Sequence, residues 1–137
     1  MRRNRKSDSH IFYQWLDYSY EDILAAKLLK EYKDCYKLAL FHCHQCIEKA
    51  LKSYILFKTK ALTDGHNLTF LCKKAINLDP AFDQWIDESI SLNKCYIETR
   101  YPSDIPSEVT EKEVNIAFTM ADNMFTFVCK ELEAEFI

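Results

Sequence analysis

Turn-forming residues are scarce in this chain, and that scarcity constrains its fold more than any other feature. One glycine, Gly65, and three prolines, Pro80, Pro102 and Pro106, occur in 137 residues. A fold with many strands needs frequent tight turns, and glycine and proline supply most of them. The sequence therefore predicts long helices joined by few loops.

Length, charge and cysteine content set further bounds. We expect residues 1–137 to form one domain, with a basic, flexible tail at residues 1–7. The formal net charge of −3 gives no electrostatic footprint for nucleic acid. No early apolar run resembles a signal peptide and no segment is apolar enough to cross a membrane, so we expect a cytoplasmic protein. The six cysteines are then expected to be reduced thiols that pack as small hydrophobes.

Residues 36–57 carry the strongest helical pattern. An apolar stripe with alternating steps of four and three comprises Tyr36, Leu40, Cys43, Ile47, Ala50 and Tyr54. A second apolar side comprises Leu38, Phe41, Ile55 and Leu56, so this helix should be covered twice. Polar residues run between the two sides: His42, Gln45, Lys49 and Ser53 on one flank, and His44, Glu48 and Lys52 nearer the other.

Four further segments should be helical. The first begins after Ser7-Asp8-Ser9, which offer capping oxygens, and runs to about Tyr32, with Lys33-Asp34 as a tight turn that returns the chain antiparallel. A short helix is expected at about 67–77, a fourth from Asp79-Pro80 to near Arg100, and a fifth after the capping box at 110–113. The sequence thus predicts an all-α, up-and-down bundle of four to five helices.

Metal binding does not fit the His42–Cys46 cluster. At 100° per residue, His42 and His44 point about 160° apart and cannot share an ion on a continuous helix. A structural zinc site would need a second ligand pair, and the other cysteines occur singly. We therefore expect no metal and no cofactor.

Nucleotide binding would have to use side chains, because the chain has no glycine-rich phosphate loop. Phosphate could be held by Lys49, Lys52 and Arg100, with His66, Tyr96 or Tyr101 stacking on a base. The alternative is that Glu48 and Lys52 form an ordinary surface ion pair and that the lysines are solvated.

Three motifs together resemble the HEPN domain family (higher eukaryotes and prokaryotes nucleotide-binding). They are the run at 41–52, His66-Asn67-Leu68, and Tyr96 to Pro102 with its Arg100-Tyr101-Pro102. The resemblance implies a helical bundle that forms a homodimer and is often encoded beside a small nucleotidyltransferase of the kanamycin-nucleotidyltransferase type. The family's polar set then falls on His42, Gln45, Glu48, Lys49, Lys52, His66, Arg100 and Tyr101.

Three hypotheses about function follow. The first is a non-catalytic, homodimeric module that binds a nucleotide or a nucleotidyltransferase partner, in a toxin–antitoxin-like pair, through a groove lined by His42, Gln45, Lys49, His66 and Arg100. The second is an atypical ribonuclease toxin that uses His42 or His66. Ribonuclease relatives carry a histidine four to six residues after the arginine, whereas no histidine follows Arg100 here. The third is a structural dimer without a ligand.

Overall fold

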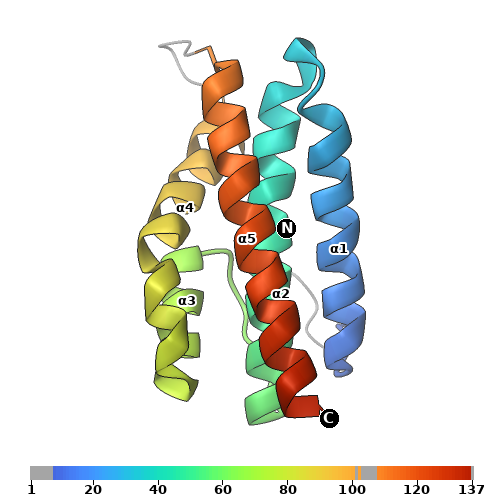
Figure 1. The fold of residues 1–137 in the computed structure, drawn as a ribbon, viewed down its shortest axis with the longest axis vertical. Helices are drawn as coiled ribbons and strands as arrows, with labels where there is room; N and C mark the ends of the chain where they lie inside the picture. Colours follow the sequence, from blue (N-terminus) through green and yellow to red (C-terminus); the bar gives the residue numbers. More distant parts are fainter. Residues whose placement is uncertain (1–7, 101, 103–107, 137) are drawn as a thin grey trace.

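The computed structural model describes residues 8–100, 102 and 108–136, with the backbone alone for 97–100 and 134–136. These residues form five α-helices, which confirms the all-α prediction: α1 (Phe12–Leu29), α2 (Tyr36–Thr59), α3 (Leu68–Leu78), α4 (Ile86–Arg100) and α5 (Glu111–Phe136). Two 3₁₀ segments, η2 (Lys33–Cys35) and η3 (Pro80–Trp85), precede α2 and α4. The helices lie side by side along the long axis of the molecule (Figure 1).

Helix α2 is the centre of the bundle and packs against α1, α3, α4 and α5. The stripe predicted from its periodicity is buried from Leu40 to Tyr54. The second apolar side is covered at Ile55 and Leu56, but Leu38 is 53% exposed, contrary to prediction. Leu38 lies in the first turn of α2, at the end of the bundle beside the turn from α1, so less of the bundle covers it.

Helices α1 and α2 form the predicted antiparallel hairpin, but the ends of α1 differ from the prediction. No side chain caps its first turn; instead the Ser9 hydroxyl accepts a hydrogen bond from the Ile11 amide at 3.0 Å, before the helix begins. The helix ends at Leu29 because the next amides, of Glu31 and Tyr32, bond to carbonyls only three residues back. Such bonds tighten the last turn and end the α-helical ladder.

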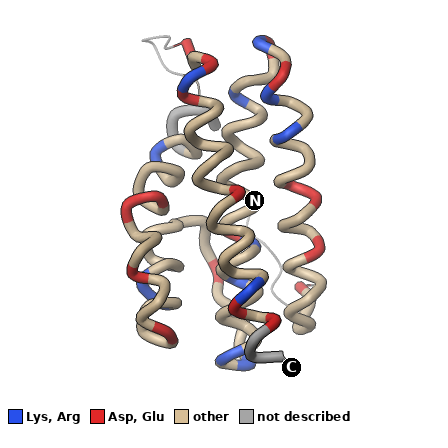
Figure 2. Tube along the Cα trace, in the orientation of Figure 1, with Lys and Arg blue, Asp and Glu red and all other residues tan. Residues whose placement is uncertain are grey.

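Helix α3 begins close to the predicted residue 67, and α5 begins at the predicted capping box. The Asn67 side chain accepts from the Phe70 amide at 3.1 Å, and the Thr110 hydroxyl accepts from the Glu113 amide at 3.1 Å. Between Val114 and Cys129, α5 carries one charged residue, Asp122, as Figure 2 shows. This long stretch with a single charge allows α5 to cover α2.

The fourth predicted helix begins as a 3₁₀ segment. Asp79 accepts from the Ala81 amide at 3.0 Å, as expected, but α-helical geometry begins only at Ile86. Each 3₁₀ residue advances about 120° instead of about 100°, which rotates the rest of the helix relative to the predicted inner face. In a continuous α-helix, steps of four from Phe82 through Ile86 would bring Ile90 to the inner side, but Ile90 is 40% exposed and Leu92 is buried in its place. Among the described helices, none is both long and apolar enough to span a membrane.

Candidate functional site

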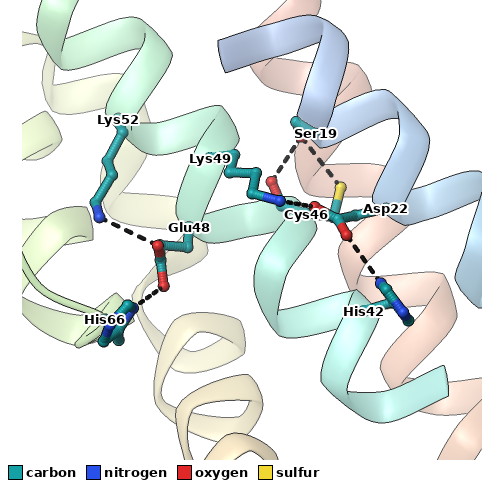
Figure 3. Close-up of polar contacts among 8 residues, drawn as sticks. All are labelled: Ser19, Asp22, His42, Cys46, Glu48, Lys49, Lys52 and His66. Carbon is teal, nitrogen blue, oxygen red and sulfur yellow. Dashed lines mark hydrogen bonds and ion pairs between the residues drawn. The ribbon is translucent and has the colours of Figure 1, made fainter. Parts of the chain in front are cut away.

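The polar residues of α2 lie in two clusters with the same composition. In each, one carboxylate joins the Nδ1 atom of a histidine to the ammonium of a lysine (Figure 3). We call the set of Asp22, His42 and Lys49 the Asp22 cluster, and the set of Glu48, Lys52 and His66 the Glu48 cluster. The two clusters occupy different flanks of α2.

The Asp22 cluster joins α1 to α2. The Asp22 carboxylate is 2.8 Å from His42 Nδ1 and 2.7 Å from Lys49 Nζ. Because an ionised carboxylate only accepts, Nδ1 of His42 carries a proton, and in the neutral form of the ring it is Nε2 that carries the lone pair. The side chains of His42, Lys49 and Asp22 are 28%, 20% and 9% exposed, so the histidine and the lysine reach solvent.

Beside this cluster, a second contact fixes the same helix pair. The Ser19 hydroxyl donates to the Cys46 carbonyl at 2.6 Å, at a fully buried position. A bond from α1 to the backbone of α2 sets how far the two helices can slide, and it places Asp22 one turn further along α1. The packing of α1 against α2 therefore fixes the positions of the Asp22 cluster residues on both helices.

The Glu48 cluster joins α2 to the loop before α3. Glu48 is 3.1 Å from Lys52 Nζ and 2.7 Å from His66 Nδ1. The side chains of Glu48 and Lys52 are only 3% and 4% exposed, whereas that of His66 is 54% exposed. The bond to the carboxylate again places a proton on Nδ1, so in the neutral form of His66 it is Nε2 that carries the lone pair.

Tyr96 and His44 cover the Glu48 cluster from α4 and α2. The Tyr96 ring stacks on His44 at 4.2 Å between centroids and on His66 at 5.8 Å. His44 Nε2 donates to the His66 carbonyl at 2.9 Å, which fixes the loop. Burial lowers the pKa of His44 from 6.5 to about 4, so this ring is neutral at physiological pH.

A hollow of about 690 Å³ opens at the start of α1, next to the Asp22 cluster. Its wall comprises Asp8, Ser9, Gln14, Trp15, Asp17, Tyr18 and Lys49. The Lys49 ammonium lies 6.0 Å from the centre of the Tyr18 ring. Lys49 therefore belongs both to the cluster and to the hollow.

The structure brings some predicted site residues together and separates others. His42 and Lys49 meet in the Asp22 cluster, while Glu48, Lys52, His66 and Tyr96 meet on the other flank. Gln45 is half-buried and lies within one helical turn of members of both clusters. The Arg100 side chain and Tyr101 lie outside the described residues, and the binding roles of the whole set stay predictions.

Two features of the site differ from the sequence analysis. The Glu48–Lys52 ion pair exists, but it is buried, so its interpretation as an ordinary surface pair is wrong. Asp22 was not among the predicted site residues. The signal was present: Trp15, Ser19, Asp22 and Ala26 follow steps of four and three on the buried side of α1, and a carboxylate on such a stripe needs a buried partner.

The cysteines of α2 and α3 belong to the core. Cys43, Cys46 and Cys72 are fully buried, and burial raises the pKa of Cys43 to about 12 and that of Cys46 further, which keeps both thiols neutral. Over the described residues, no three His, Cys, Asp or Glu side chains are grouped so that they could hold a metal ion.

Comparison with known proteins places the chain in a family. The protein TT1696 from Thermus thermophilus is 24% identical, with a TM-score of 0.77 over 90% of this chain and 100% of that one. ST0689, an archaeal HEPN homologue, is 23% identical, with a TM-score of 0.70 over 96% and 99%. At such identities both show a shared fold. No curated protein matches the chain in sequence. The family model of the HEPN domain matches residues 12–132, and the chain therefore belongs to the HEPN domain family.

Proposed function

We propose that this HEPN domain is a non-catalytic binding module that acts as a homodimer and binds a nucleotide at the hollow beside the Asp22 cluster. The observation that carries the proposal is the position of Lys49, whose ammonium lies in the wall of that hollow together with Trp15 and Tyr18. The volume of about 690 Å³ falls within the range of about 300–1,000 Å³ that is usual for small-ligand sites.

Each group in the hollow suits one part of a nucleotide. The Tyr18 side chain is 60% exposed, so its ring can stack on a base, a contact that contributes about 1–3 kcal/mol in comparable sites. Lys49 supplies a cation for phosphate, and Asp8 and Asp17 can accept hydrogen bonds from ribose hydroxyls or an exocyclic amine. One lysine against two carboxylates favours a nucleoside monophosphate over a triphosphate.

Calorimetric titration of the protein with AMP, ATP and GTP tests this assignment. We expect AMP to bind more tightly than ATP, and Lys49→Ala and Tyr18→Ala each to weaken AMP binding by about tenfold. Lys60→Ala is the matched control, because Lys60 also lies over an aromatic ring, that of Phe57 at 4.8 Å, away from the hollow. The absence of heat with every nucleotide would remove the small-molecule part of the proposal.

The proposal extends to a protein partner, a small nucleotidyltransferase in a two-component, toxin–antitoxin-like pair. Its support is membership of the family and the exposed position of the hollow, where a nucleotide held by another protein could also enter. Co-purification of the tagged chain with the product of its neighbouring gene tests this part. Binding that survives Lys49→Ala and Tyr18→Ala would show that the partner uses another surface.

The Glu48 cluster favours a second candidate, an atypical ribonuclease. A buried carboxylate that holds Nδ1 of an exposed histidine fixes the tautomer whose Nε2 can accept a proton, and it stabilises the imidazolium that results. In this candidate His66 would take the proton of a ribose 2′-hydroxyl, whose oxygen bonds to the neighbouring phosphorus as the P–O5′ bond breaks, which leaves a 2′,3′-cyclic phosphate and a 5′-hydroxyl that takes up a proton.

Expression in a bacterial host, together with incubation of the purified protein with RNA, separates the two candidates. Growth arrest and RNA cleavage that are lost in His66→Ala and reduced in Glu48→Gln would favour the ribonuclease. His10→Ala is the control, because His10 is exposed and outside both clusters. Harmless expression and intact RNA would leave the binding module as the function.

A further inference from the structure

The outer side of α1 is unusually apolar for a surface. Tyr13, Tyr20, Leu24 and Leu28 are 52%, 52%, 41% and 70% exposed. Helix α1 lies at one edge of the bundle (Figure 1). Of the four residues, Tyr20 also contacts α5, where its ring lies 6.1 Å from that of Phe125. Single exposed apolar residues are common, but four on one side of one helix indicate a contact surface, and tyrosine is enriched in such surfaces.

The spacing of this side is that of a helix–helix seam. Tyr13, Asp17, Tyr20, Leu24 and Lys27 follow one another in steps of four, three, four and three. This is the heptad spacing that allows two helices to pack along their length. We call these five residues the outer stripe.

The charges of the outer stripe are arranged symmetrically. Asp17 lies in the first half of α1 and Lys27 near its end, and Figure 2 shows the acidic positions of this helix before its basic one. Neither residue forms an ion pair with any other residue that the structure describes. Both lie five residues from position 22, with Tyr20 and Leu24 two residues from it on either side.

We propose that the outer stripe packs against the outer stripe of a second copy of this chain, antiparallel, with the two-fold axis at the level of residue 22. This register places Asp17 opposite Lys27 of the second copy and Tyr20 opposite Leu24 of the second copy, twice each. A parallel pairing would instead place like charges opposite each other, which is unfavourable.

An apolar groove beside the outer stripe extends this contact. The groove, of about 360 Å³, runs between α1 and α5 and is lined by Phe12, Tyr13, Leu16, Cys129, Leu132 and Glu133. In the antiparallel register, Leu28 of the second copy lies level with Leu16, at this groove. The most exposed leucine of α1 thus meets an apolar groove on the other copy, and the two-fold axis repeats the contact.

The same pairing would complete the proposed nucleotide site, and this step rests on the proposed function. Asp17 also lines the hollow, so the second copy would bring its Lys27 to the edge of that hollow. A second cation there would offset one of the two carboxylates in the wall. Nucleotide binding should therefore be tighter in the dimer than in the monomer.

Sedimentation equilibrium of the full chain, with AMP calorimetry on the same samples, tests the interface. We expect a species of twice the 16.2 kDa chain mass for the wild type. Asp17→Lys and Lys27→Asp should each raise the dimer dissociation constant by about tenfold or more, and the double variant should return it to within about threefold of wild type. Leu24→Asp should give a monomer that binds AMP more weakly. Ile90→Asp on α4 is the matched control, since Ile90 is 40% exposed and Leu24 is 41% exposed.

The results separate failure of the interface from failure of the function. A wild type that sediments at the mass of one chain overturns both the interface and the proposed homodimer. A dimer that persists in Leu24→Asp and in both charge variants overturns the interface alone.

A double variant that dimerises as weakly as the single variants overturns the antiparallel register. Equal AMP affinity in wild type and Leu24→Asp overturns the shared site, whereas a dimer without any nucleotide heat removes only the nucleotide function. Thermal unfolding followed by circular dichroism identifies any variant that fails to fold. If Leu24→Asp fails to fold, the comparison of the two single charge variants with the double variant tests the interface instead.

Discussion

The Asp22 cluster and the Glu48 cluster contain the same three kinds of side chain but differ in where the protein buries them. In the Glu48 cluster the carboxylate and the lysine are 3% and 4% exposed, and only the histidine, at 54%, reaches water. In the Asp22 cluster the carboxylate is 9% exposed, while the lysine and the histidine are 20% and 28% exposed. The histidine is thus more exposed in the Glu48 cluster, whereas the lysine is internal there and borders a hollow in the Asp22 cluster.

The two clusters therefore have different roles, although they contain the same kinds of side chain. A buried ammonium without its carboxylate costs several kcal/mol, so the Glu48–Lys52 pair is tied to the stability of the fold. The Lys49 ammonium, which is paired with Asp22 at 2.7 Å but also reaches solvent, can exchange that partner for a ligand at a smaller cost. The four predictions below test this contrast.

Glu48→Gln should have the largest effect on stability. The substitution leaves the Lys52 ammonium buried without a counter-charge, and we expect the free energy of unfolding to fall by about 3–5 kcal/mol. Urea denaturation followed by circular dichroism measures the change. A loss below about 1 kcal/mol would mean that Lys52 reaches water in solution, and the contrast between the clusters would fail.

Acid should destabilise the protein through His44, which adjoins the Glu48 cluster. Its pKa is about 4 in the folded protein and 6.5 when unperturbed, so between these values the unfolded chain binds a proton that the folded chain does not. Stability attributable to His44 is therefore complete above pH 6.5 and falls as the pH drops toward 4, by about 3 kcal/mol in all. Urea denaturation at several pH values should show this slope in the wild type and a shallower one in His44→Gln. Parallel slopes would contradict the prediction.

Asp22→Asn should cost less than Glu48→Gln. Both of its partners, His42 and Lys49, reach solvent and can be hydrated, so we expect a loss of about 1–2 kcal/mol in the free energy of unfolding. The substitution should also change AMP binding, since Lys49 loses the carboxylate that positions it at the hollow. Equal losses from Asp22→Asn and Glu48→Gln would show that the exposure of the lysine does not separate the two clusters.

The fold could be predicted from the sequence because its signals are local. The stripe of α2 and the cap at Thr110 each depend on residues a few positions apart, and the structure confirms them. The prediction failed where the chain changes from 3₁₀ to α-helical geometry within what the sequence indicates as one helix. The 3₁₀ segment at 80–85 rotated α4 and exchanged Ile90 for Leu92 on its buried side.

The site could be predicted only within one helix. Spacing identified Glu48 and Lys52 as an i, i+4 pair, but their burial depends on the loop at His66 and on Tyr96 of α4, which no spacing on α2 reveals. Likewise, Lys49 and His42 find their common partner on α1, 27 and 20 residues away. A hydrophobic pattern in the sequence predicts which residues are buried, but it does not predict which polar side chains from different helices contact one another.

Replacing both charges of the buried pair should have the smallest effect on stability. In Glu48→Met with Lys52→Met, two apolar side chains of similar length occupy a site that is almost fully buried, and no unpaired charge remains. We expect the free energy of unfolding to lie within about 1 kcal/mol of wild type, far from the loss in Glu48→Gln, because desolvation of the ion pair offsets most of its attraction. A loss as large as that of the single variant would instead mean that the pair itself stabilises the fold. With stability preserved, the double variant isolates the remaining role of the cluster: His66 has lost the carboxylate that holds its Nδ1 proton, so any function that disappears must depend on that orientation.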